Sequence, residues 1–142
     1  MNDTFRHQAY KVELKPTSEQ KQIIERTVGV CRYVYNLFIC TNRDNYRSNT
    51  QGYMSGYDFS KWLNNEYRKA NPEKSWIWEV SSKAVKKSIM NADTAYKNFL
   101  KGKTGFPNFK RRNSKPVSMY LPRNNDCDLK SRKRDTIRKY RD

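Results

Sequence analysis

Three stretches with helical periodicity constrain the fold of this chain most. Apolar residues recur at steps of three and four in residues 24–38, 59–67 and 85–100, which predicts three amphipathic helices that can bury one another. The inward-facing residues are expected to be Ile24, Val28, Cys31, Tyr35 and Phe38 in the first helix, Phe59, Trp62, Leu63 and Tyr67 in the second, and Val85, Ile89, Ala92, Tyr96, Phe99 and Leu100 in the third.

Residues typical of helix ends bound these stretches. Thr17 begins a capping box, Thr-Ser-Glu-Gln, at the start of the first helix. Asn71-Pro72 ends the second helix, Ser81 or Ser82 caps the third, and Gly102 ends it. Trp76 to Trp78 are predicted to form an apolar knot in the loop between the last two helices.

Strand signals flank the helices. Residues 8–15 alternate, with Tyr10, Val12 and Leu14 on one face, which is typical of a half-buried strand. Residues 117–121 form a second, short strand candidate. We therefore expect an α+β fold in which the helical block is an insertion within a small sheet or barrel.

The charge of the chain is concentrated near its C-terminal end. Residues 97–142 carry fifteen Lys or Arg against four Asp or Glu, and the whole chain has a formal net charge of +16. Such a field attracts polyanions and releases their counterions. Nucleic acid is the leading candidate partner, and an acidic membrane surface is the weaker one.

Cysteine and histidine usage does not point to a metal, a cofactor or a catalytic centre. Cys31, Cys40 and Cys127 contain no CxxC pair, a pattern typical of a reduced, intracellular protein. Cys31 and Cys40 fit packing on the first helix, and His7 is the only histidine. We expect a soluble, cytoplasmic protein with no membrane span.

Basic residues interleaved with aromatics are the strongest functional signal. Lys110, Arg111 and Arg112 beside Phe106 and Phe109 offer contacts to phosphates and faces for base stacking. The residues predicted to bind nucleic acid are Lys11, Lys15, Arg32, Tyr35, Asn36, Tyr57, Ser60, Ser82, Lys83, Lys86, Lys87, Lys97, Lys101, Lys103, Phe106, Phe109, Lys110, Arg111, Arg112, Arg123 and Asn124.

Five motifs occur in an order that resembles a known family. They are residues 10–17 (YKVELKPT) followed by Glu19-Gln20, residues 29–36 (GVCRYVYN), residues 78–80 (WEV), residues 95–99 (AYKNF) and residues 105–110 (GFPNFK). Together they resemble the TnpB (OrfB) proteins of bacterial insertion sequences, over residues 8 to about 121.

The resemblance implies a fold and a function. That family consists of RNA-guided DNA endonucleases related to type V CRISPR effectors, and its opening segment is described as a transposase-like helix-turn-helix. A helical recognition lobe interrupts a wedge-like β-barrel there, and the two parts hold the guide RNA and read DNA flanking the target. The chain would then comprise residues 1–16 as the first wedge strand and residues 17–103 as the recognition lobe. Residues 104–142 would be a basic loop returning to an incomplete barrel, with a disordered or truncated end.

The polar pair with which the family reads the flanking DNA would fall on Ser82 and Lys86, and an aromatic residue used in the same way would fall near Gly56 or Tyr57. The family's RuvC-like nuclease domain, with its three acids and zinc-binding insert, is not in this sequence. We therefore expect that the chain does not catalyse DNA cleavage and that it binds structured RNA and duplex DNA. It would be a truncated remnant or a fragment of such a nuclease, or a regulator. The alternative is one half of a split endonuclease, completed by a separate RuvC-like chain; a small basic RNA-binding protein of ribosomal type is a weaker third interpretation.

Overall fold

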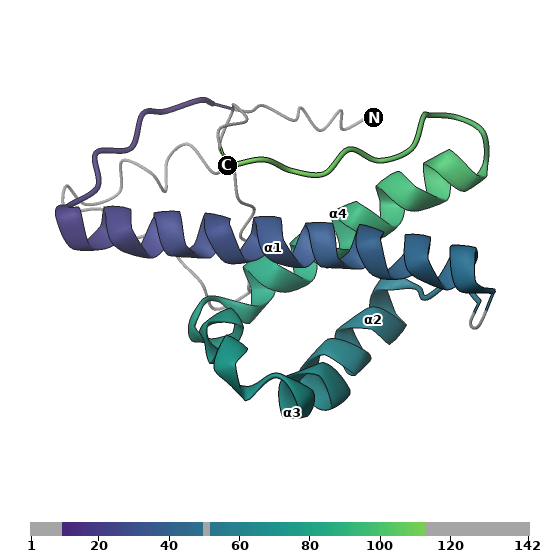
Figure 1. Ribbon diagram of the computed structural model, residues 1–142. Helices are drawn as coiled ribbons and strands as arrows, with labels where there is room; N and C mark the ends of the chain where they lie inside the picture. The colour runs from purple at the N-terminus through teal and green to yellow at the C-terminus, as the bar shows by residue number, and fades with distance from the viewer. Residues whose placement is uncertain (1–9, 50–51, 113–142) are drawn as a thin grey trace, which may run out of the picture. The chain divides into compact units, whose positions relative to one another are not determined.

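The structure, a computed structural model, describes residues 10–49 and 52–112 (Figure 1). Residues 10–17 belong to a unit separate from the helices and are described by themselves. The elements of the helical unit are α1 (Ser18–Ser48), α2 (Gly56–Trp62), the π-helical turn η1 (Leu63–Tyr67), α3 (Arg68–Ala70), the 3₁₀ segment η2 (Pro72–Glu79) and α4 (Ser82–Leu100).

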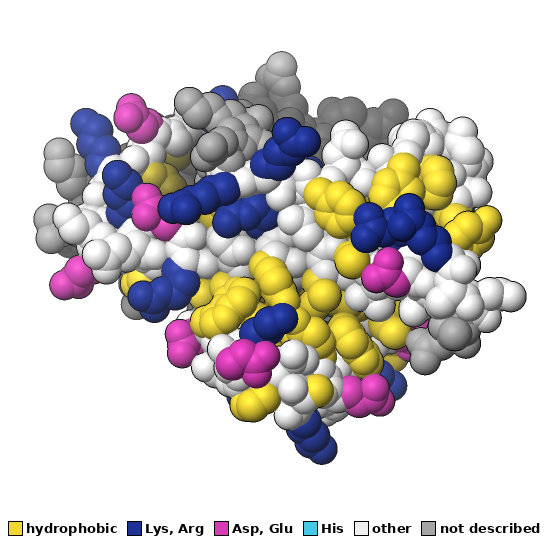
Figure 2. Space-filling view, viewed as in Figure 1, with side chains coloured by type: hydrophobic (Ala, Val, Ile, Leu, Met, Phe, Trp, Pro, Cys, Tyr) yellow, Lys and Arg dark blue, Asp and Glu magenta, His cyan; other side chains and the backbone are white. Residues whose placement is uncertain are grey.

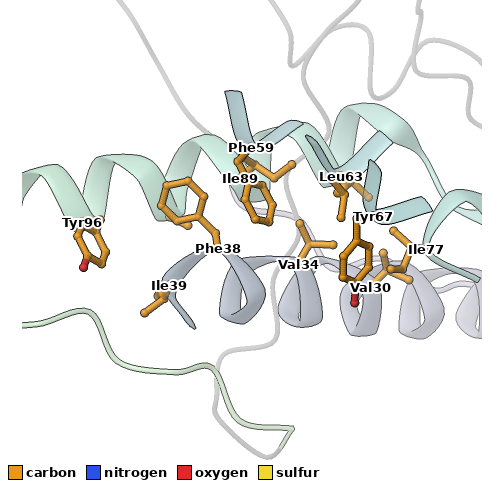
Figure 3. Packing of buried hydrophobic residues seen from close by; sticks show 12 residues of the cluster. Val30, Val34, Phe38, Ile39, Phe59, Leu63, Tyr67, Ile77, Ile89 and Tyr96 are labelled. Atoms are coloured by element: carbon orange, nitrogen blue, oxygen red, sulfur yellow. The ribbon is translucent and has the colours of Figure 1, made fainter. Parts of the chain in front are cut away.

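The core lies where α1 crosses α4 and where the α2–η1 segment packs beside them. Val34, Phe38 and Ile39 of α1 are fully buried, and Figure 3 shows side chains of α1 pointing toward those of α2, η1 and α4. The buried cluster consists of Val30, Val34, Phe38, Ile39, Phe59, Leu63, Tyr67, Ile77, Val85, Ile89, Ala92 and Tyr96. The prediction that the helical stretches bury one another is thus confirmed.

The helix ends lie where the local sequence signals predict them. Helix α1 begins directly after Thr17, and the segment from α2 to α3 ends before Asn71-Pro72. Helix α4 begins after Ser81, as predicted, but the side chain of Ser81 makes no capping hydrogen bond. Gly102, with φ of 74°, ends it: its N–H donates to the carbonyl of Phe99, and the next N–H donates to that of Asn98. That pattern is a Schellman motif, in which a left-handed glycine lets the chain turn away from the helix.

The predicted apolar face of α1 is displaced by about one residue. The buried residues of this helix are Thr27, Val30, Cys31, Val34, Phe38, Ile39 and Asn42. Of the five predicted positions only Cys31 and Phe38 are buried, whereas Ile24, Val28 and Tyr35 are half-buried. Two polar side chains extend the buried face, and Asn42 is held there by hydrogen bonds to the backbone of Met54, of 3.1 and 2.8 Å.

Two further expectations about apolar residues need correction. The Trp76–Trp78 knot lies in the 3₁₀ segment η2 and not in an irregular loop, and within it only Ile77 is buried. Leu100, expected on the inner face of the third helix, is exposed because it is the last residue of α4.

The expected α+β fold, with a wedge-type sheet or barrel, is wrong for the part of the chain that the structure describes. Residues 10–17 have no regular structure, and no strand occurs among the described residues. Tyr10, Val12 and Leu14 are all more than half exposed. Alternation places side chains on two faces, but a strand also needs a neighbouring backbone to bond its N–H and C=O groups. The partner expected for it, residues 117–121, and the end of the predicted third domain lie outside the described residues. The predicted domain boundaries stay a prediction.

Candidate nucleic-acid interface

The segment after α4 turns back and runs along α1 (Figure 1). We call residues 101–112 the basic segment, because it contains five Lys or Arg residues and no Asp or Glu. Pro107 is buried. The ring of Phe106 packs edge-on against Tyr96 and Phe99, with ring centres 5.8 and 5.2 Å apart. These apolar contacts hold the first half of the segment against α4.

A pair of hydrogen bonds fixes the second half of the basic segment to α1. The side-chain amide of Asn36 donates to the carbonyl of Lys110 over 2.9 Å, and the N–H of Lys110 donates to Oδ1 of Asn36 over 2.7 Å. The ammonium group of Lys110 lies 5.0 Å from the ring centre of Tyr35. The guanidinium of Arg43 lies 5.3 Å from the ring centre of Phe109. We call the Asn36–Lys110 pair of hydrogen bonds the clip.

The clip brings predicted binding residues together from positions 74 apart in the sequence. Tyr35 and Asn36 of α1 both contact Lys110, and Arg32 lines a hollow together with Asn36. Figure 2 shows Lys and Arg side chains distributed along α1, with hydrophobic side chains among them. Phe106 and Phe109 are each about 40% exposed, so only part of each ring is accessible to a binding partner.

A second group of predicted residues meets between α2 and the start of α4. Ser60, Ser82 and Lys86 line a small hollow of about 70 Å³, together with the indole of Trp78. Tyr57, one turn before Ser60, is 65% exposed, and the ammonium group of Lys61 lies 4.7 Å from its ring centre. Most of the residues that line the hollow are apolar, and two hydroxyl groups, an amide and an amine lie among them.

The remaining predicted residues of the helical unit lie outside both the clip region and the hollow lined by Ser60, Ser82 and Lys86. Lys83, Lys101 and Lys103 are exposed and Lys87 is half-buried. Lys97 forms an ion pair of 3.0 Å with the buried carboxylate of Asp93, which gives it a structural role.

The other predictions concern the two ends of the chain. Lys11 and Lys15 are exposed in the separate segment 10–17. Arg123 and Asn124 lie outside the described residues.

A third surface feature, a hollow of about 390 Å³ on α1, contains the predicted residues Arg32 and Asn36 beside others that the sequence analysis did not assign to a site. It is lined by Arg26, Gly29, Val30, Arg32, Tyr33, Asn36 and Trp76. The α1 residues Arg26, Gly29, Tyr33 and Asn36 recur at steps of three and four, so this stripe was visible in the sequence as a second face of the helix. Its mixed composition concealed it from a search for apolar periodicity.

Behind that hollow, a lysine bridges two tyrosines. The hydroxyl groups of Tyr33 and Tyr67 share a hydrogen bond of 2.6 Å, and the ammonium group of Lys74 donates to both over 2.9 Å. These hydrogen bonds raise the pKa of Lys74 above its ordinary value. The pKa of Tyr67 is raised as well, chiefly by burial. The cluster therefore ties η2, which carries Trp76, to α1 and η1.

Among the residues that the structure describes, no three His, Cys, Asp or Glu side chains lie close enough to hold a metal ion. Burial of Cys31 raises the pKa of its thiol, in agreement with the predicted packing role, whereas Cys40 is half-buried. Within residues 10–49 and 52–112, no helix combines the length and the apolar character that a membrane span requires.

Comparisons with known proteins bear on the predicted resemblance. Residues 1–51 match the family model of the IS605 OrfB type described as a helix-turn-helix domain. The described part of that range, residues 10–49, contains one uninterrupted helix, α1. Over 115 residues the chain is 30% identical to "Putative RNA-guided DNA endonuclease InsQ" of Escherichia coli (strain K12), and the match covers 81% of this chain but 28% of that protein. The chain therefore spans less than a third of its relative, and its resemblance to the TnpB (OrfB) family is confirmed.

Proposed function

We propose that this chain is a nucleic-acid-binding region of a TnpB-like, transposon-associated protein, which contacts structured RNA and duplex DNA. The observation that carries the proposal is the clip, because it fastens a segment with five basic and no acidic residues across α1. The name of the E. coli relative, an RNA-guided DNA endonuclease, supports both kinds of partner.

Fixing the basic segment has an energetic consequence for binding. A flexible basic loop loses conformational entropy when it is ordered on a polyanion, whereas a segment already docked on a helix loses less. The apolar contacts of Phe106 and the clip at Lys110 order the backbone between them. Lys110 thus presents its charge from a fixed position, and Arg111 and Arg112 follow it directly in the chain. We propose that the three cations contact a phosphate backbone, as cations that position nucleic acid do.

The hollow lined by Ser60, Ser82 and Lys86 is proposed as the contact with DNA flanking the target. Hydroxyl and ammonium groups can bond both to phosphate oxygens and to base edges. Tyr57, exposed one turn away, offers an aromatic face beside them. The family resemblance assigns the polar pair to Ser82 and Lys86, and the hollow supports that assignment because it brings both side chains to one place.

The experiment is a salt titration of binding with matched charge variants of the full chain. The double variant Arg111→Ala/Arg112→Ala is compared with Lys21→Ala/Lys69→Ala, which removes the same charge from exposed positions outside both surfaces. Removing one cation that binds a phosphate should lower the slope of log affinity against log salt by about 0.9 for duplex DNA. We expect the first variant to lower the slope by about 2 and to bind all sequences more weakly. Equal slopes for the two double variants would contradict the proposal.

A further inference from the structure

The hollow on α1 has the size and the lining of a site for a small planar ligand. Its volume of about 390 Å³ falls within the range of about 300–1,000 Å³ that ligand pockets occupy. One wall is aromatic, formed by Tyr33 and Trp76 in an edge-to-face pair with ring centres 5.0 Å apart. Trp76 is 36% exposed, so part of the indole is open to a partner.

The aromatic wall is held in place from behind. Tyr33 cannot turn away without breaking its hydrogen bonds to Tyr67 and Lys74. Lys74 also lies 5.4 Å from the ring centres of both tyrosines. An aromatic surface that is already ordered loses little entropy when a flat ligand stacks on it.

The charges around the hollow select an anionic ligand. Arg26 and Arg32 line it, and no acidic side chain does. Asn36 forms its edge and is bonded to the backbone of Lys110, so the basic segment lies at its rim. Arginine binds phosphate through paired N–H groups in a fixed plane.

The base of the hollow is formed by a glycine within a helix. A Cβ atom added at Gly29 would meet only the guanidinium of Arg32, at 3.9 Å, so the space above it is empty. Glycine is, after proline, the least favourable residue for a helix interior. A larger residue here would therefore favour the helix while filling the hollow.

We propose that this hollow binds one unpaired nucleotide of a single-stranded nucleic acid, with its base against Trp76 and its phosphate at Arg26 and Arg32. The inference rests on the proposed function for the class of partner and adds a distinct site and a preference for unpaired strands. Bases within a duplex are stacked on one another and cannot offer a face to an indole. The other two surfaces are proposed to contact phosphates and the edges of paired bases, neither of which requires an unpaired base.

The test compares single-stranded and duplex binding by two variants of the full chain. Trp76→Ala removes the stacking face. Gly29→Leu fills the hollow, keeps the indole and favours the helix, so its effect cannot be attributed to loss of folding. Tyr46→Ala, which removes an aromatic side chain that is 82% exposed on the same helix, is the control. The probes are 12-nucleotide oligo(U) and oligo(dT), and a hairpin duplex of equal charge whose strands are joined by a polyethylene glycol linker, so that it contains no unpaired base.

We expect Trp76→Ala and Gly29→Leu to weaken binding of both single strands by about 5- to 150-fold, the range of one base–aromatic stack, and to leave hairpin binding unchanged. The control Tyr46→Ala should bind all probes as the parent chain does. If both variants bind single strands as the parent does, while salt-dependent hairpin binding persists, the inference is overturned and the proposed function stands. Equal weakening for single strands and hairpin would also overturn it. If the parent chain binds neither the single strands nor the hairpin, both the inference and the proposed function are refuted.

Discussion

Loss of the clip should release the second half of the basic segment while leaving the helical core intact. Asn36→Ala removes both hydrogen bonds to Lys110, of 2.9 and 2.7 Å. Each such bond contributes about 0.5–1.5 kcal/mol, and because this site is exposed we take the lower part, about 1–1.5 kcal/mol for the pair. The population in which the segment is detached should then rise by about 5- to 12-fold, since about 1.4 kcal/mol is a factor of ten.

Limited trypsin digestion measures that population. Trypsin cleaves after Lys110, Arg111 and Arg112, and its rate follows the fraction of open molecules when opening is fast relative to cleavage. We expect cleavage after these residues, located by mass spectrometry, to accelerate by the same factor. Cleavage within α4 should not change, because the helix does not depend on the clip.

Asn65→Ala is the matched control for this experiment. Asn65 is also an exposed asparagine, but its side chain donates over 2.8 Å to the carbonyl of Lys61 within its own helical segment. Its removal should leave cleavage at residues 110–112 unaltered. An unchanged rate for Asn36→Ala, or an equal increase for Asn65→Ala, would refute the conclusion that the clip holds the segment.

Two further predictions concern stability. Phe38 is fully buried, and its ring centre lies 5.2 Å from that of Phe59, so Phe38→Ala should lower the free energy of unfolding by about 3–5 kcal/mol. Urea denaturation measures this loss, and the control is Ile23→Ala, at an exposed site on α1, for which we expect a change of less than about 0.5 kcal/mol. The pKa of Tyr53 is raised by burial and by its hydrogen bond to Asp93, so this tyrosine contributes stability that is complete below its unfolded pKa of about 10 and declines as pH rises further. Tyr53→Phe should therefore flatten the loss of stability between about pH 10 and 11, and an equally steep decline in the variant would show that other groups cause it.

Helix positions could be derived from the sequence because their signals are local. A capping or helix-breaking residue acts within one turn of its own position. Helix α1 begins after Thr17, the α2–α3 segment ends before Asn71-Pro72, and α4 ends shortly before Gly102. The same periodicity indicated most of the core residues of the α2–η1 segment and of α4, but not those of α1, where Val30, Val34 and Ile39 are buried instead of Ile24, Val28 and Tyr35. The family resemblance, carried by motifs distributed along the chain, was likewise accessible without a structure.

Tertiary contacts decided the rest, because they join residues that no local pattern relates. The buried face of α1 includes Asn42, a polar residue whose place depends on the backbone of Met54. The alternation of residues 10–15 does not produce a strand, since a strand needs a partner backbone that the pattern cannot supply. The candidate interface likewise depends on Asn36 meeting Lys110 across 74 residues of sequence. The sequence determined the helices and their charges, and the packing of those helices determined which side chains share a surface.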